Sequence, residues 1–127
     1  MAIRKEFSLR LQNSPGALGK VCRYLTDEKV GIQALSLDSG GTLRMVVDNP
    51  LRAAGLLKEK QYAIEERDVL LMQVPNAVGS LYNATRLLDG AGVNVEHAYA
   101  CSFEAQPMAS VVVAVDDIAR ASMVAGV

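Results

Sequence analysis

A short motif occurs twice in this chain of 127 residues. Residues 15–21 read P-G-A-L-G-K-V, and residues 75–81 read P-N-A-V-G-S-L, an offset of 60. A second match follows at an offset of 61, between V-G-I-Q at residues 30–33 and A-G-V-N at residues 91–94. Similarity at a nearly constant spacing is typical of a repeated structural unit. The sequence therefore predicts two copies of one small module, residues 1–67 and residues 68–127.

The first copy alternates strand and helix patterns. Apolar and polar residues alternate over residues 7–12, as in a half-buried strand, and N-S-P-G at residues 13–16 is a strong turn signal. Leu18, Val21, Cys22 and Leu25 then recur at the spacing of an amphipathic helix. Further strands are expected at residues 32–37, 43–48 and 62–65, with a second helix beginning at Pro50.

The second copy shows the same order of elements. It predicts strands at residues 69–74, 93–103 and 108–115, and helices at residues 77–88 and 116–124. The order βαββαβ indicates an α+β fold of two ferredoxin-like modules, each an antiparallel sheet with both helices on one face. Because so few residues follow the last helix, we expect the second module to lack its last strand. Another segment or another chain should cover the open sheet edge.

Both faces of the predicted sheets are apolar. Val69 and Leu70 point to opposite faces in one strand, as do Val112 and Val113 in another. Two helices per module cover only one face, so a second subunit is expected to cover the other. This pattern predicts a homodimer.

Charge and cysteine usage exclude several classes of function. The net charge is −1, which argues against a nucleic-acid partner. No charge-free apolar run reaches the roughly 20 residues of a membrane span, and no secretory signal precedes the first strand. Cys22 and Cys101 form no metal-binding or redox motif, so both are expected to be buried small hydrophobes in a reducing, cytoplasmic setting. No metal or other cofactor is predicted.

Catalytic residues are also not evident. His97 and Glu96 are neighbours in a strand and so point to opposite faces. The strand expected at residues 43–48 has no aromatic residue on which an RNA-binding module could stack bases. The first turn has an Asn but no Arg, which weakens an acylphosphatase interpretation. A non-catalytic protein is therefore predicted.

The first turn remains as the candidate site. A turn that ends at a helix N-terminus presents unpaired backbone N–H groups at the positive end of the helix dipole, which suits a carboxylate. Gly16 allows a ligand to approach the backbone, and the Asn13 amide can bond a carboxylate or an ammonium group. The alternative is that these residues only cap the helix.

These motifs resemble the ACT domain, a small regulatory module that binds amino acids in many metabolic enzymes. The resemblance rests on N-x-P-G-x-L at residues 13–18, on V-G-I-Q at residues 30–33 and on A-G-V-N at residues 91–94. It covers nearly the whole chain, twice, with no enzyme domain attached. The family resemblance implies a tandem ACT protein whose modules pair through their second strands.

The resemblance also implies where a ligand binds. The effector lies between the first turn of one module and the start of the second strand of the other, so Asn13 and Gly16 would face Asn94. A second site would combine Gln73 and Gln33, with Asn76 in the place of the glycine, and is expected to be degenerate. The candidate residues are Asn13, Ser14, Pro15, Gly16, Ala17, Leu18, Asn94, Gln33, Gln73 and Asn76.

The resemblance thus implies a regulatory sensor of a small amino acid, acting on a metabolic enzyme or another regulator. The alternative is a structural oligomerisation module without a ligand.

Overall fold

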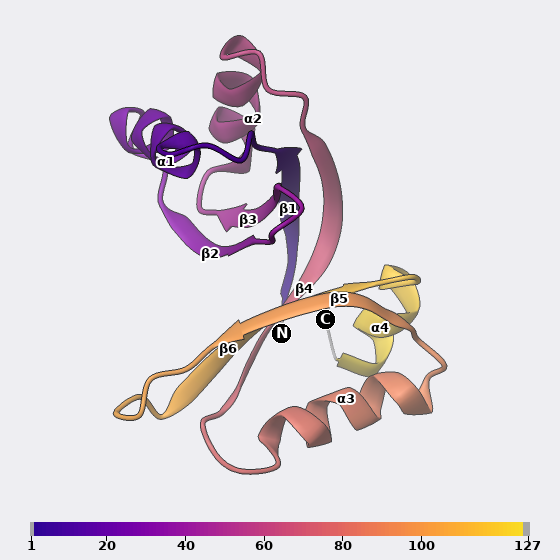
Figure 1. Ribbon diagram of the computed structural model, residues 1–127. Helices are drawn as coiled ribbons and strands as arrows, with labels where there is room; N and C mark the ends of the chain where they lie inside the picture. Colours follow the sequence, from indigo (N-terminus) through magenta and orange to yellow (C-terminus); the bar gives the residue numbers. More distant parts are fainter. Residues whose placement is uncertain (1, 126–127) are drawn as a thin grey trace. The chain divides into compact units, whose positions relative to one another are not determined.

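The structure, a computed structural model, describes residues 2–125. Four helices and six strands lie within these residues (Figure 1). In chain order they are β1 (Ala2–Arg10), α1 (Ala17–Asp27), β2 (Ile32–Leu37), β3 (Thr42–Val47), α2 (Pro50–Glu59), β4 (Glu65–Pro75), α3 (Ser80–Gly90), β5 (Val95–Cys101), β6 (Met108–Val115) and α4 (Ile118–Ala125).

The chain divides into two compact units. The first module is Lys5–Arg67, and the second module contains the residues from Asp68 onward together with the start of β1, up to Arg4. Both β1 and β4 therefore contribute residues to both modules.

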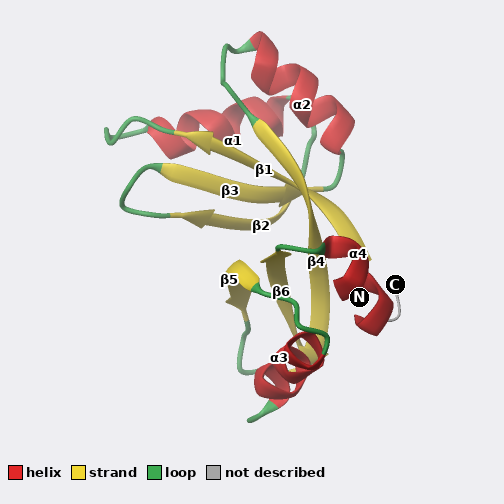
Figure 2. Cartoon of the chain, turned by 90° about the vertical axis from the view of Figure 1, so that its right-hand side faces the viewer, coloured by secondary structure: helices red, strands yellow, loops and turns green. Residues whose placement is uncertain are grey.

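The first module is an antiparallel sheet covered by two helices. Its strands lie in the order β2-β3-β1-β4, with β3 paired antiparallel to β2 and to β1. The helices α1 and α2 lie on the same side of β1, β2 and β3 (Figure 2). This order of strands and helices is the ferredoxin-like arrangement that the sequence predicted.

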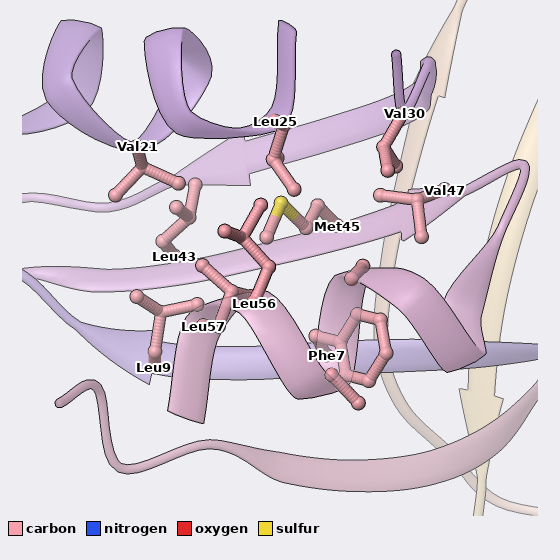
Figure 3. Close-up of a cluster of buried hydrophobic side chains, with 12 residues drawn as sticks. Phe7, Leu9, Val21, Leu25, Val30, Leu43, Met45, Val47, Leu56 and Leu57 are labelled. Atoms are coloured by element: carbon pink, nitrogen blue, oxygen red, sulfur yellow. The ribbon is translucent and has the colours of Figure 1, made fainter. Parts of the chain in front are cut away.

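Apolar side chains on one face of the strands and on one face of each helix form the core of the first module. Val21 and Leu25 of α1 and Leu57 of α2 face Met45 of β3 and Phe7 of β1, and all five are buried (Figure 3). Each such side chain contributes about 1.5–3 kcal/mol by leaving water. The amphipathic stripe predicted for the first helix is thus the surface that holds it against the sheet.

The second module repeats this plan with a borrowed strand. Its strands lie in the order β1-β4-β6-β5, and α3 and α4 pack through Ala84, Leu88 and Ala121 on one face. No strand follows α4 within residues 2–125, as predicted. The place of the fourth strand is taken by the first residues of β1, which belong to this module. A segment of the same chain therefore covers the edge that the sequence left open.

One strand is longer than expected. Separate strands at residues 62–65 and 69–74 were predicted, but β4 runs without a break over Glu65–Pro75. The charged residues 65–68 between the two apolar runs contain no glycine or proline, so nothing in them turns the chain.

Some apolar residues on the helix-free faces of the strands are buried as well. Val46 of the first module and Val69, Val112 and Ala114 of the second are buried but belong to neither of the two core clusters. The homodimer expected from the sequence stays a prediction.

Candidate functional site

The turn between β1 and α1 leaves polar groups unused. Gly16 immediately precedes α1 with φ 84°, and no side chain caps this helix. The amides of Ala17 and Lys20 bond back to Ser14 and Gly16, but those of Leu18 and Gly19 have no backbone acceptor among the described residues of the turn. The capping role that was the alternative for Asn13 and Ser14 is therefore not what these side chains do.

A small cavity adjoins this turn. It has a volume of about 200 Å³ and is lined by Asn13, Ser14, Gly16, Ala17 and Leu18 of this turn and by residues of the β2–β3 turn. Pro15 lies on the other side of the turn, where it lines a separate cavity. The Asn13 side chain is exposed and makes no hydrogen bond to any described residue. The first module thus brings together the six turn residues that the sequence proposed.

The structure changes the alignment of the two repeats. Gly79 precedes α3 with φ 87°, just as Gly16 precedes α1, and these two glycines stand 63 residues apart. The bond from Lys20 N to Gly16 O, 2.9 Å, is matched by the bond from Asn83 N to Gly79 O, 2.9 Å. The equivalent of Gly16 is therefore Gly79, and Asn76 is not in the place of the glycine, as the sequence alignment had it.

With this alignment Asn76 is the equivalent of Asn13, and the two asparagines are used differently. The Asn76 side-chain amide donates to the backbone oxygens of Phe103 (2.8 Å) and Gln106 (3.0 Å) in the β5–β6 turn. Asn13 has no such partner. The sequence could not show this difference, because the two acceptors lie 27 and 30 residues away from Asn76.

Asn94 also has a different equivalent in the first module from the one that the sequence comparison gave. The backbone N–H of Asn94 donates to Asp116 Oδ1 at 2.9 Å, and in the first module the same bond joins Gly31 to Asp48 at 2.9 Å. Asn94 is therefore equivalent to Gly31 rather than to Gln33. Its side chain is exposed and has no partner among the described residues.

The two glutamines lie apart from the turns. Gln33 is exposed at an irregularity of β2, next to Ile32, whose partner is Val47. The first turn lies at the other end of that sheet, where Arg10 pairs with Thr42. Gln73 is exposed on β4 and is equivalent to Arg10, not to Asn13. Within each module, then, the turn and the start of the second strand lie at opposite ends of the sheet.

The remaining reactive side chains form no metal site. No group of three or more His, Cys, Asp or Glu residues within residues 2–125 is arranged to hold a metal ion. Both cysteines are free; Cys22 is half-buried and Cys101 is exposed, so the expectation that both are buried is wrong. The rings of His97 and Tyr99 stack, with centroids 6.3 Å apart.

A family model described as an ACT domain pair matches residues 1–125. This chain belongs to the ACT domain pair family. The resemblance seen in the sequence is thereby confirmed, together with the α+β fold. Among curated proteins, none matches this ACT domain pair.

Solved structures share the fold of this ACT domain pair. Protein BT0572 from Bacteroides thetaiotaomicron has a TM-score of 0.89 at 28% identity, over 98% of this chain and 87% of that chain. The ligand-free regulatory subunit of aspartate kinase from Thermus thermophilus has a TM-score of 0.73 at 14% identity, over 98% and 92%. The corresponding subunit from Thermus flavus has a TM-score of 0.67 at 14% identity, over 98% and 90%. In the described part of this ACT domain pair, no helix is long and apolar enough to cross a membrane.

Proposed function

We propose that this ACT domain pair is a non-catalytic regulatory protein that binds a small amino acid at the first turn. The α-carboxylate would accept hydrogen bonds from the free N–H groups at the start of α1, where the helix dipole also favours negative charge. The Asn13 amide would bond the carboxylate or the ammonium group. The observation that carries this proposal is the Asn13 side chain, which lines a cavity and has no hydrogen-bond partner among residues 2–125.

The size of the cavity supports a ligand of this class. Its 200 Å³ is below the roughly 300–1,000 Å³ of sites for drug-sized molecules. The lining combines Leu11, Leu18 and Leu37 with polar groups of the turn. An apolar wall beside a cluster of donors suits an amino acid with a small side chain.

We further propose that a second module completes the site. The start of β2 lies too far along the sheet to serve the first turn of its own module. The unengaged amide of Asn94, before β5, is our candidate for the completing contact. Gln33 and Gln73 remain candidates for a weaker, pseudo-symmetric site, in which Asn76 would have to give up its bonds to the β5–β6 turn.

Calorimetric titration after a thermal-shift screen of the twenty amino acids tests this proposal. A ligand at about 100 times its Kd should stabilise the folded protein by roughly 2.7 kcal/mol. We expect one strong site per chain. Asn13→Ala should weaken binding by about tenfold, the value of one hydrogen bond to a charged group. Asn94→Ala should weaken it as well.

Asn76→Ala is the matched control, because it removes the equivalent amide from a turn where that amide is already engaged. Binding at the strong site should be unchanged in this variant. Equal losses for Asn13→Ala and Asn76→Ala would contradict the asymmetric site. Unchanged melting temperatures with all twenty amino acids would favour the alternative function, a structural oligomerisation module.

We propose a cytoplasmic homodimer that acts on a separate metabolic enzyme. The regulatory subunits of aspartate kinase that share this fold have nearly the same extent, since the match covers 92% and 90% of them. β2 and β5 end the strand order, and each leaves a backbone edge that another copy could pair with. Ligand binding would bias that assembly through different affinities for two states.

A further inference from the structure

A second cavity lies between the first turn and the segment that follows α2, and it shares Leu11, Gln12, Ser14, Gly16 and Ala17 with the amino-acid site. It has a volume of about 550 Å³, within the range of small-molecule sites. Three cationic residues line it: Arg10 at the end of β1, Lys20 in α1 and Lys60 after α2. We call it the basic cavity.

The basic cavity contains no compensating negative charge. No aspartate or glutamate lines it, and none of its three cations forms an ion pair with a described residue. Arg10 donates one hydrogen bond to the backbone oxygen of Gly40 at 2.8 Å, and the Lys60 ammonium lies 4.9 Å from the centre of the Tyr24 ring. These contacts orient the two side chains without neutralising them. Positive charges around one cavity repel each other when no negative charge compensates them. An anion bound there would relieve this electrostatic repulsion.

The second module shows that the fold does not require these cations. The equivalent of Arg10 is Gln73, and the equivalent of Lys20 is Asn83, by the alignment through Gly16 and Gly79. The same elements therefore form with neutral residues, and the positive charge is specific to the first module.

We infer that the basic cavity binds a phosphate-bearing small molecule. A phosphoryl group carries close to two negative charges and three acceptor oxygens, which matches several donors converging from different elements. Lysine serves as a point charge for phosphate, and the arginine guanidinium offers a planar pair of donors. Gly16 also lines the basic cavity, so the backbone of the first turn borders both cavities.

This inference does not depend on amino-acid binding. The Asn13 side chain lines the smaller cavity and not the basic cavity. A regulator with both sites would respond to two metabolites, one of them phosphorylated.

Titration calorimetry with pyrophosphate at fixed ionic strength tests the inference. Wild type should bind one pyrophosphate per chain, and citrate at the same ionic strength should bind at least tenfold more weakly. The double variant Arg10→Gln/Lys20→Asn should bind pyrophosphate at least tenfold more weakly, since each charge-assisted bond is worth a factor of about ten. It carries the residues of the second module at equivalent positions, so it should fold; circular dichroism checks this.

Two further variants keep the test decisive. Lys60→Gln removes a cavity cation and should also weaken binding, whereas Lys58→Gln removes an exposed cation from the end of α2, outside the lining, and should not. Asn13→Ala should leave pyrophosphate binding unchanged while it weakens amino-acid binding. The inference is overturned if wild type does not bind pyrophosphate, if citrate binds equally well, or if Lys60→Gln binds like Lys58→Gln.

Discussion

Gly31 lies so close to Asp48 that a side chain would not fit without movement. A Cβ atom at Gly31 would be 2.6 Å from Asp48 Oδ2, while Oδ1 of the same carboxylate accepts the Gly31 N–H. Gly31→Ala should therefore lower the free energy of unfolding by about 1.5–3 kcal/mol, the range for a lost hydrogen bond to a charged group. Urea denaturation measures this change.

Gly55 is the matched control for that substitution. It lies in α2, and a Cβ atom there would meet nothing within 4 Å. Gly55→Ala should raise the free energy of unfolding by about 0.5–1 kcal/mol, because alanine loses less backbone entropy in a helix. If both substitutions changed stability in the same direction, the close approach of Asp48 would not be the cause of the Gly31 effect.

Residue patterns predicted the site incompletely. The sequence identified the first turn as special, and all of residues 13–18 except Pro15 line one cavity. The sequence comparison aligned the second turn wrongly, because it matched Pro15 with Pro75. The structure instead makes Gly79 the equivalent of Gly16. The backbone conformation decided the alignment, since a positive φ identifies the equivalent glycine. The amino-acid sequence alone offers more than one glycine to match. The basic cavity was missed because residues 10, 20 and 60 share no motif.

At the scale of elements, the β5–β6 turn depends on one side chain from another loop. Asn76 bonds two of its backbone oxygens, and Asn76 N donates to Pro107 O at 2.9 Å. Asn76→Ala should lower the free energy of unfolding by about 2 kcal/mol, one for each side-chain bond. Amide exchange at Gln106 should also become faster.

Asn13→Ala supplies the comparison. It removes an amide without a partner, so stability without ligand should change by no more than about 0.5 kcal/mol. A loss of stability as large as that of Asn76→Ala would show that Asn13 has a structural role instead.

The spacing of apolar residues along the sequence predicted most of the helices and strands. The predicted strands at residues 32–37 and 108–115 have the bounds of β2 and β6. The start of α3 was placed three residues early, because Ala77 and Val78 resemble helix residues although the turn continues to Gly79. The full length of β4 was also missed, since its first four residues are all charged and contribute to no apolar alternation.

At the scale of the whole molecule, the homodimer can be tested through the β2 edge. Leu35 and Leu37 pair with Met45 and Leu43 but remain 36% and 41% exposed. If β2 pairs with a second copy, Leu35→Lys/Leu37→Lys should convert the dimer to a monomer in sedimentation experiments, because two charges would be buried. Leu51→Lys, at an 87% exposed position on α2, should leave the dimer intact. A monomeric wild type would contradict the proposal.

The start of β1 has a consequence for how the chain is made. Residues 2–4 leave the ribosome long before α4, yet they complete the sheet whose other strands come from the second half of the protein. Contacts between segments so distant in sequence form late, because closing a long loop is entropically costly. Residues 2–4 of the nascent chain therefore stay unpaired in this sheet until β4 has left the ribosome, and a chaperone or tag that held them would delay maturation of the second module alone.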